Sequence, residues 1–369
     1  MTLTAADIFL YASSFFGLYS AILFLIVYFE NRDRLHAPAP KRFPAVTVAV
    51  PAYNEERTVA GTIQSLLELD YPHEKLDIIV VDDGSKDKTL EIARSFEKTG
   101  RVRVFTKPNG GKGTALNFAL THACGEFFGA LDADSFVEPD CLKKMIGYFD
   151  NPNVMAVTPA MKVRNPQGIL QRVQAAEYLL GVYLRKVFGM MGSIHVTPGP
   201  FSIYRKWFFD THGGYDERNI TEDIEVALRI QRNQFIIENV IDGVVTTVSP
   251  RSFKQLQKQR LRWYTGFLKN VVAYRDLFSL KHGQLGLFIL PGSFITVGIA
   301  IVLLFLTLSR VGDVWYRQLL DMVAIRFDIL PLINFEFSAF SLSTKPLVII
   351  GMLALIFGIA MVWIAKKQS

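Results

Sequence analysis

The chain has 369 residues, of which 50% are hydrophobic and only 20% are charged. This composition is too apolar for a typical soluble protein. The formal net charge is +6, but the cations cluster beside apolar runs instead of spreading with aromatic residues over a soluble face. That distribution argues against a nucleic-acid-binding protein and favours anionic lipid head groups or an anionic substrate as partners.

Three apolar runs account for the hydrophobic excess, at residues 8–29, 285–308 and 346–365. Each has about 20 residues or more, which is enough to cross a bilayer as a helix. The first run could instead be a signal peptide. However, its leader "MTLTAAD" has no cation, its apolar stretch is long, and no clear A-x-A site follows. We therefore expect three retained transmembrane helices.

The charges beside these runs predict the membrane topology. Basic residues follow the first run and precede the second, whereas the 310–345 connection balances its charges. The positive-inside rule then places the N-terminus outside the cell and the segment between the first two spans in the cytoplasm, together with the C-terminus. We predict an integral protein of the cell membrane, with 310–345 as an extracytoplasmic or interfacial loop.

Residues 44–250 alternate strand and helix signals. The segments "AVTVAVPA", "LDIIVVDD", "RVRVFTK" and "EFFGALDAD" are predicted as strands, and helical patterns lie between them. Repeated βα units predict an α/β domain with a mostly parallel sheet and helices on both faces. In such sheets, ligands bind at the carboxyl ends of the strands.

Acidic residues stand where three of these strands end. Glu55 follows the first strand, Asp82 and Asp83 the second, and Asp132 and Asp134 the fourth. Any one of them alone is explained by a turn, because Asp and Asn are common turn formers. Together they predict an acidic sheet edge. Asp132 and Asp134, on alternate positions, are hard oxygen ligands suited to Mg²⁺ or Mn²⁺, which could bridge a diphosphate.

Two further segments carry candidate chemistry. The glycine-rich turn at 107–117 lacks the full Walker spacing, but it places Lys112 at a helix start, either to meet a phosphate or as a solvated lysine. The segment 219–232 opens a helix with Thr221 as the expected N-cap. Glu222 and Asp223 would lie in its first turn, where the helix dipole favours acids. Asp223 is also placed to serve as a general base.

The segment 251–281 is predicted to form amphipathic helices at the membrane interface. Phe253, Leu256, Leu261, Trp263, Phe267 and Val271 are its expected apolar anchors. An interfacial helix explains its cations and its tryptophan. It does not explain the order Gln259-Arg260-Leu261-Arg262-Trp263.

These motifs, taken in order, resemble the family-2 membrane glycosyltransferases, a group that includes hyaluronan, cellulose and poly-N-acetylglucosamine synthases and the related ceramide glucosyltransferases. The resemblance rests on Asp83, Asp132-x-Asp134, Thr221-Glu222-Asp223 and the Gln259–Trp263 run, and covers about residues 44–266. It implies a GT-A (Rossmann-like) fold, a UDP-sugar donor, Mg²⁺ or Mn²⁺, and a single displacement that inverts the anomeric carbon.

The resemblance also implies roles for individual residues. Asp223 would be the base, with Glu222 beside it. Asp132 and Asp134 would hold the metal. The residues implied to contact the nucleotide sugar or to cap the site are Tyr53, Glu55, Asp82 (the weaker candidate), Asp83, Lys112, Asp132, Gln259, Arg260, Arg262 and Trp263.

Three functions remain open from the sequence. The first is a synthase that extends a polysaccharide, with a second copy of the chain or an accessory membrane subunit completing a channel. The second is transfer of one or a few sugars to a membrane lipid. The third is an inactive membrane scaffold that binds a nucleotide sugar, which is disfavoured because every motif residue is present. The donor sugar, the linkage and the product length are not predicted.

Overall fold

The computed structural model describes residues 5–324 and 346–368. Contacts divide the chain into two units. One unit comprises Met1–Ile22 and Phe288–Phe357, and the other comprises Leu23–Leu287 and Gly358–Ser369. We call the second the catalytic unit, after the activity that the resemblance implies for its α/β domain. The predicted α/β domain lies wholly within the catalytic unit.

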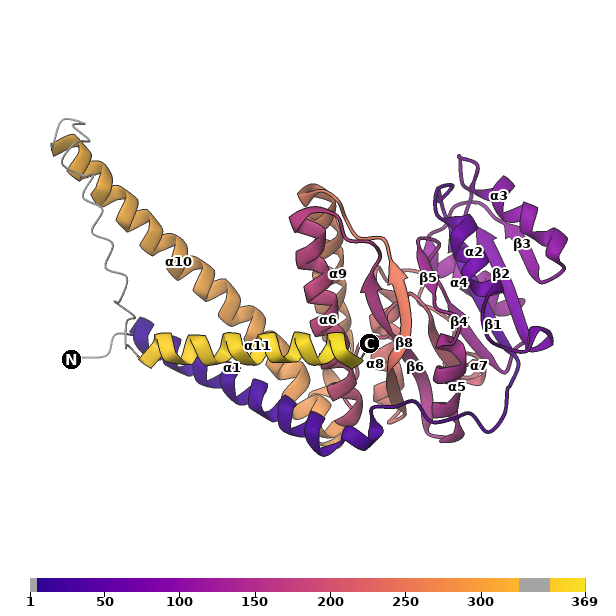
Figure 1. The fold of residues 1–369 in the computed structure, drawn as a ribbon, viewed down its shortest axis with the longest axis horizontal. Coiled ribbons are helices and arrows are strands. Elements are labelled where there is room, and N and C mark those ends of the chain that lie inside the picture. The colour runs from indigo at the N-terminus through magenta and orange to yellow at the C-terminus, as the bar shows by residue number, and fades with distance from the viewer. Residues whose placement is uncertain (1–4, 325–345, 369) are drawn as a thin grey trace. The chain divides into compact units, whose positions relative to one another are not determined.

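The catalytic unit contains one eight-stranded sheet (Figure 1). Its strands are β1 (Val46–Ala52), β2 (Leu76–Asp82), β3 (Val102–Thr106), β4 (Phe127–Ala130), β5 (Ser135–Val137), β6 (Val154–Val163), β7 (Ser202–Arg205) and β8 (Ile236–Thr247). Its helices are α2 (Val59–Leu67), α3 (Thr89–Ser95), α4 (Lys112–Thr121), α5 (Cys141–Ile146), α6 (Gly168–Met190), α7 (Lys206–His212), α8 (Glu222–Arg232) and α9 (Phe253–Ala273). The strand order is β3-β2-β1-β4-β7-β6-β8-β5.

The first four strands of this order, β3-β2-β1-β4, are parallel to one another. Ala52 aligns with Asp82 between β1 and β2, and Asp82 aligns with Thr106 between β2 and β3. Because the register brings the strand ends level, the acidic residues that follow β1, β2 and β4 reach the same sheet edge. The predicted acidic edge is therefore present.

The rest of the sheet is mixed. β7 is antiparallel to both β4 and β6, β6 is parallel to β8, and β5 is antiparallel to β8. The sheet as a whole is mostly parallel, as predicted. The antiparallel pair of β5 and β8 aligns Ser135 with Thr247, so that Thr247 at the end of β8 comes close to the Asp132–Asp134 turn.

Two hydrophobic cores confirm the prediction of helices on both faces. On one face, α2 contributes Ile63 and Leu66 and α5 contributes Leu142 and Met145. On the other face, residues from α4, α7 and α8 pack together, with Leu116, Phe208, Val226 and Ile230 among them. Both faces of the parallel strands are apolar because both are covered.

Long apolar helices occur at both ends of the chain. They are α1 (Ala5–Glu30), α10 (Leu290–Ala324) and α11 (Pro346–Gln368). Within the described residues, the segments Asp7–Glu30 and Leu285–Ala324 are long and apolar enough to span a membrane. The predicted third span, 346–365, falls inside α11.

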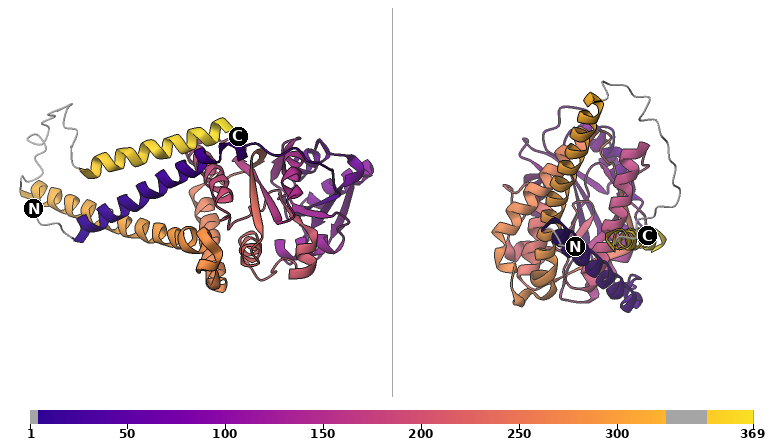
Figure 2. Two further views of the ribbon diagram at one scale, coloured as in Figure 1. Left: turned by 90° about the horizontal axis from the view of Figure 1, so that it is seen from below. Right: turned by 90° about the vertical axis from the view of Figure 1, so that its left-hand side faces the viewer.

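The second apolar run was predicted to be a span over 285–308, and the helix that contains it is longer than that. Helix α10 ends only at Ala324, and Figure 2 draws it in orange as one long helix. A charged stretch is as compatible with a helix as an apolar one, so the drop in hydropathy did not mark the helix end. The rest of the predicted loop, 325–345, lies outside the described residues.

Helix α9 forms within the segment predicted to be amphipathic. A capping box opens it, in which the Ser252 hydroxyl accepts a hydrogen bond from the Gln255 backbone N–H. Two of the predicted apolar anchors, Phe253 and Leu261, are exposed, whereas Val271 is buried. The exposed apolar side chains of α9 are Phe253, Leu261, Tyr264, Leu268 and Val272.

Candidate active site

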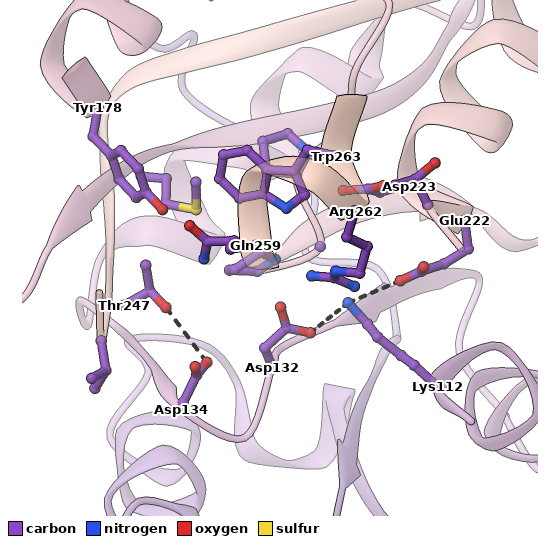
Figure 3. A pocket seen from close by; sticks show the side chains of 16 residues that line it. Lys112, Asp132, Asp134, Tyr178, Glu222, Asp223, Thr247, Gln259, Arg262 and Trp263 are labelled. Carbon is purple, nitrogen blue, oxygen red and sulfur yellow. Dashed lines mark hydrogen bonds and ion pairs between the residues drawn. The ribbon is translucent and has the colours of Figure 1, made fainter. Parts of the chain in front are cut away.

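Two neighbouring cavities lie at the acidic sheet edge. The inner cavity has a volume of about 150 Å³ and the outer cavity about 380 Å³. Four residues line both of them: Lys112, Asp132, Asp134 and Arg262. The inner cavity is shown in Figure 3, where residues from α4, α8, α9 and the turn that follows β4 converge on one space. The sheet edge and two helices that are distant in sequence therefore form a single site.

Lys112 links two acids in the inner cavity. Its Nζ lies 2.6 Å from Asp132 Oδ1 and 2.9 Å from Glu222 Oε1 (Figure 3). Burial alone would lower the pKa of this ammonium, but the charges of Asp132, Glu222 and Asp223 raise it overall. Lys112 therefore stays positively charged, and it is placed to meet the charge of a phosphate.

Asp223 and Glu222 are neighbours with different protonation behaviour. Burial and the charge of Glu222 raise the pKa of Asp223 to about 6. Burial alone would also raise the pKa of Glu222, but the attraction of Lys112 lowers it overall. The Asp223 carboxylate accepts one hydrogen bond, from the Ile224 backbone N–H at 2.9 Å. Asp223 is thus the better proton acceptor of the two.

Asp134 is held against the end of β8. Its carboxylate accepts hydrogen bonds from the hydroxyls of Ser135 at 3.1 Å and Thr247 at 3.4 Å. Burial, then the charges of Asp132 and Glu55, raise the pKa of Asp134 to about 6. A divalent cation between Asp132 and Asp134 would relieve this repulsion.

The carboxylates at this turn are suited to a divalent metal whose remaining ligands come from the substrate and from water. Among the described residues, no group of three or more His, Cys, Asp or Glu side chains could hold an ion. Mg²⁺ commonly takes one or two carboxylates and completes its shell with substrate phosphates and water. Gly199 keeps this space open, since a Cβ there would lie 2.5 Å from Lys112 Nζ and 3.1 Å from Asp132 Oδ2.

The outer cavity contains three further residues that are predicted to contact the nucleotide sugar. Tyr53, Glu55 and Asp83 all line it, and Tyr53 is exposed. The Asp83 carboxylate accepts hydrogen bonds from the backbone N–H groups of Gly110 (3.0 Å) and Gly111 (2.7 Å), and it pairs with Lys107 Nζ at 2.6 Å. Asp83 therefore also fixes the glycine-rich turn.

Asp82, the weaker candidate, does not belong to the site. Its side chain is 1% exposed and lines neither cavity. Its carboxylate accepts hydrogen bonds from the Thr106 hydroxyl at 2.9 Å and the Ser85 backbone N–H at 3.3 Å. Successive residues of a strand point to opposite sides, so only Asp83 faces the cavity.

Three residues of the α9 motif line the inner cavity: Gln259, Arg262 and Trp263. Arg260 does not, which corrects the prediction that it contacts the nucleotide sugar. Its guanidinium pairs with Glu177 of α6 at 2.7 Å and lies over the Trp263 ring, 4.3 Å from the centroid. On a helix, neighbouring positions point about 100° apart, so Arg260 stabilises Trp263 from outside the cavity.

Helix α9 is held against the start of α8 by residues that sequence reasoning missed. Asn270 is buried, and its amide donates hydrogen bonds to the Thr221 hydroxyl at 3.0 Å and the Thr221 carbonyl at 3.3 Å. A Cβ on Gly266 would collide with the Thr221 side chain, so the two helices approach closely there. Thr221 occupies the N-cap position, as predicted, but its side chain makes no capping hydrogen bond.

Tyr178 of α6 and Met161 of β6 also line the inner cavity, and sequence reasoning did not single them out. Tyr178 stands in Figure 3 on the opposite side of the labelled group from Glu222 and Lys112. The Gln259 amide oxygen is buried and has no hydrogen-bond partner within the described part of the chain. A buried unsatisfied acceptor is costly, so this end of the cavity is suited to a polar ligand that donates a hydrogen bond.

The comparisons with known proteins agree with this arrangement. Residues 47–213 match the family model described as "Glycosyl transferase family 2". This part of the chain is a glycosyl transferase family 2 domain. Among solved structures, the mannosyltransferase PcManGT from Pyrobaculum calidifontis, in complex with GDP-Man and Mn²⁺, has a TM-score of 0.57 at 23% identity, over 72% of this chain and 76% of that one. The catalytic unit has the GT-A fold.

Similar curated proteins come from staphylococci. The poly-beta-1,6-N-acetyl-D-glucosamine synthase of Staphylococcus epidermidis is 32% identical over 265 residues, which are 70% of this chain and 63% of that relative. The synthase of the same name from Staphylococcus aureus is 32% identical over 250 residues, 66% of this chain and 60% of the relative. The chain therefore spans less than two thirds of the length of these relatives.

Proposed function

We propose that this protein is an inverting glycosyltransferase that takes a sugar from a UDP-sugar and adds it to a growing glycan at a membrane surface. One observation carries the proposal: Asp132, Asp223 and Arg262 line the same cavity, although they come from three separate elements. A metal-binding acid, a base and a cation for the leaving group are what such a transfer needs. A scaffold without activity would not need this convergence.

In the proposed reaction, Asp223 removes the proton from the acceptor hydroxyl as the oxygen attacks the anomeric carbon. The bond from that carbon to the diphosphate breaks on the opposite side, so the configuration is inverted. Lys112 and Arg262 offset the charge that develops on the diphosphate. Mg²⁺ or Mn²⁺, held by Asp132 and Asp134, would supply Lewis-acid stabilisation of the same leaving group.

The donor we propose is UDP-N-acetylglucosamine. The similarity to the staphylococcal poly-beta-1,6-N-acetyl-D-glucosamine synthases supports this choice and supports a polymer as the product. The candidate spans Asp7–Glu30 and Leu285–Ala324 support a location in the membrane. We retain the topology with the N-terminus outside and the catalytic unit in the cytoplasm as part of the proposal.

The substitution Asp223→Asn tests the base. An amide is nearly the same size as a carboxylate but cannot accept the proton, so transfer should fall by about 10²–10⁴-fold. Purified full-length protein would be assayed with radiolabelled UDP-N-acetylglucosamine. Binding of UDP should be retained in the variant, which would show that the site is folded. If Asp223→Asn transfers sugar at the wild-type rate, another group is the base.

The identity of donor and product is tested in the same assay. UDP-N-acetylglucosamine, UDP-glucose and UDP-glucuronate would be compared, each after chelation of metal and again with Mn²⁺ restored. Label retained on a gel supports polymer synthesis. Label that moves with extracted lipid would instead identify a glycolipid synthase. Equal incorporation from all three donors would contradict the choice of N-acetylglucosamine.

A further inference from the structure

A third cavity lies in the catalytic unit, separate from the other two. Its volume is about 520 Å³, and none of its lining residues lines the inner or outer cavity. Residues from α7, from the end of α8 and from the short 3-10 turns Arg275–Leu277 and Leu280–His282 surround it. The lining residues are His212, Arg229, Arg232, Asn233, Tyr274, Asp276, Lys281 and His282. We call it the basic cavity.

The charge in the basic cavity is mostly positive. Arg229, Arg232 and Lys281 are cationic, and Asp276 is the one acid that lines it. Asp276 pairs with Arg232 at 2.7 Å. Cations at the end of α8 are also favoured by the helix dipole, which accounts for Arg229 and Arg232. It does not account for Lys281, which lies outside that helix.

Arg229 is a fixed cation in this cavity. Its guanidinium donates to the backbone carbonyls of His212, Gly213 and Gly214 at 2.7–2.8 Å and pairs with Glu225 at 3.1 Å. Its Nε is buried and has no hydrogen-bond partner within the described residues. Because an unsatisfied buried donor is costly, an acceptor from outside the protein would stabilise this group.

Lys281 and His282 are available for a ligand. Neither side chain forms an ion pair or a hydrogen bond with another described residue, whereas Arg229 and Arg232 are both paired. A lysine ammonium can donate up to three hydrogen bonds to a phosphate. The two residues lie just before Leu285, where a candidate membrane span begins.

Exposed apolar side chains occur in the segment that leads to these cations. Leu280, directly before Lys281, is 78% exposed, and Val272, two residues before the lining residue Tyr274, is 69% exposed. Exposed apolar side chains contribute nothing to the binding of a soluble anion. A phospholipid, in contrast, presents a phosphate next to acyl chains that such side chains can contact. Basic residues immediately beside a span are typical of anionic lipid recognition.

We propose that the basic cavity binds a phosphate group, supplied by the head group of an anionic phospholipid. Lys281 and Arg232 would contact the phosphate oxygens, while the exposed Leu280 would contact the acyl chain. The same chemistry could be met by free phosphate, so the experiment separates the two sources. The proposal does not depend on glycosyl transfer, and its test does not measure transfer.

The experiment uses the full-length protein in a neutral detergent. Binding of dihexanoyl phosphatidylglycerol, dihexanoyl phosphatidylcholine and inorganic phosphate would be measured by isothermal titration calorimetry. The variants are Lys281→Gln, Arg232→Gln and the double variant. Arg229 is left unchanged because it holds three backbone carbonyls. Lys254→Gln, an exposed lysine of α9 outside the cavity, is the matched control.

Each cavity variant should raise the Kd for phosphatidylglycerol about fivefold, and the double variant about 25-fold, since one basic residue near an anionic lipid contributes about 1 kcal/mol. Lys254→Gln should change it less than twofold. Inorganic phosphate that binds as tightly, with the same sensitivity, would assign the site to a soluble anion and overturn the lipid source. Unchanged phosphatidylglycerol binding in a double variant with wild-type circular dichroism would overturn the site itself.

Discussion

Two acids at the same sheet edge are held differently. Asp83 lies in the loop after β2, and Asp223 lies at the start of α8, where α9 packs. Asp83 accepts two backbone hydrogen bonds and one ion pair from the glycine-rich turn. The Asp223 carboxylate accepts one hydrogen bond, from its own helix. The first acid is therefore part of the framework that shapes the outer cavity. The second keeps lone pairs free for a proton and has a pKa raised by burial and by Glu222.

The strongest test of this difference is Asp83→Ala. The substitution removes the ion-pair partner of Lys107, whose mostly buried ammonium keeps hydrogen bonds to the Pro108 carbonyl and the Thr114 hydroxyl, and it frees the backbone N–H groups of Gly110 and Gly111. We expect a loss of about 2–4 kcal/mol in the free energy of unfolding and a KM for the donor raised at least tenfold. Chemical denaturation and donor kinetics would measure the two effects.

A matched control for this test is Asp70→Ala. Asp70 forms an exposed ion pair with Lys143 at 2.9 Å, so its loss should cost less than about 1 kcal/mol. The framework role of Asp83 would be wrong if both substitutions cost the same.

A smaller effect is expected for Gly266→Ala. The added methyl group would collide with Thr221, so α9 would move away from α8 and carry Gln259, Arg262 and Trp263 with it. Misplacement of about 1 Å can lower a rate by about 10²-fold, and we expect a kcat 10–100-fold lower with a nearly unchanged donor KM. Steady-state kinetics would show this split.

Gly181→Ala on α6 is the control for the helix contact. A Cβ at Gly181 meets no atom within 4 Å, so kcat should remain at the wild-type value. An equal loss in both variants would mean that the α8–α9 contact has no special role.

The smallest effect concerns pH. If Asp223 is the base, its deprotonated form is active, so kcat/KM should fall as the pH drops through about 6. Removing the Glu222 charge lowers the pKa of Asp223. In Glu222→Gln the acid limb should therefore move to lower pH, by about one unit. Glu217 is exposed, so Glu217→Gln should leave the acid limb of the pH profile of kcat/KM in place. If the acid limb also stays in place in Glu222→Gln, the two acids are not coupled.

Much of the site could be predicted from sequence because its parts follow parallel strands. Buried strands have a clear pattern, and the carboxyl ends of neighbouring parallel strands meet at one edge. The sequence therefore predicted that Asp83, Lys112, Asp132 and Asp134 lie at one sheet edge, and all four line the cavities there. It did not show that Asp82 points away from the cavities, because the pattern of a strand end does not reveal which of two adjacent acids faces a cavity.

The sequence pattern did not predict how α9 packs. Amphipathicity predicted the helix but not the side on which it meets α8, so Arg260 was placed in the site while Gly266 and Asn270 were overlooked. Contacts between residues about fifty positions apart, such as Asn270 with Thr221, leave no local signal.

The order of motifs and the hydrophobic pattern by themselves determined the α/β class, the acidic sheet edge and the apolar helices, since strand period and burial are properties of short segments. Only the tertiary structure decided which residues share a cavity: it brought α9 onto α8, turned Arg260 outward and gathered Arg229, Arg232 and Lys281 around the basic cavity. The physical reason is that these arrangements depend on close packing between elements far apart in the chain, where one missing Cβ sets how near two helices lie.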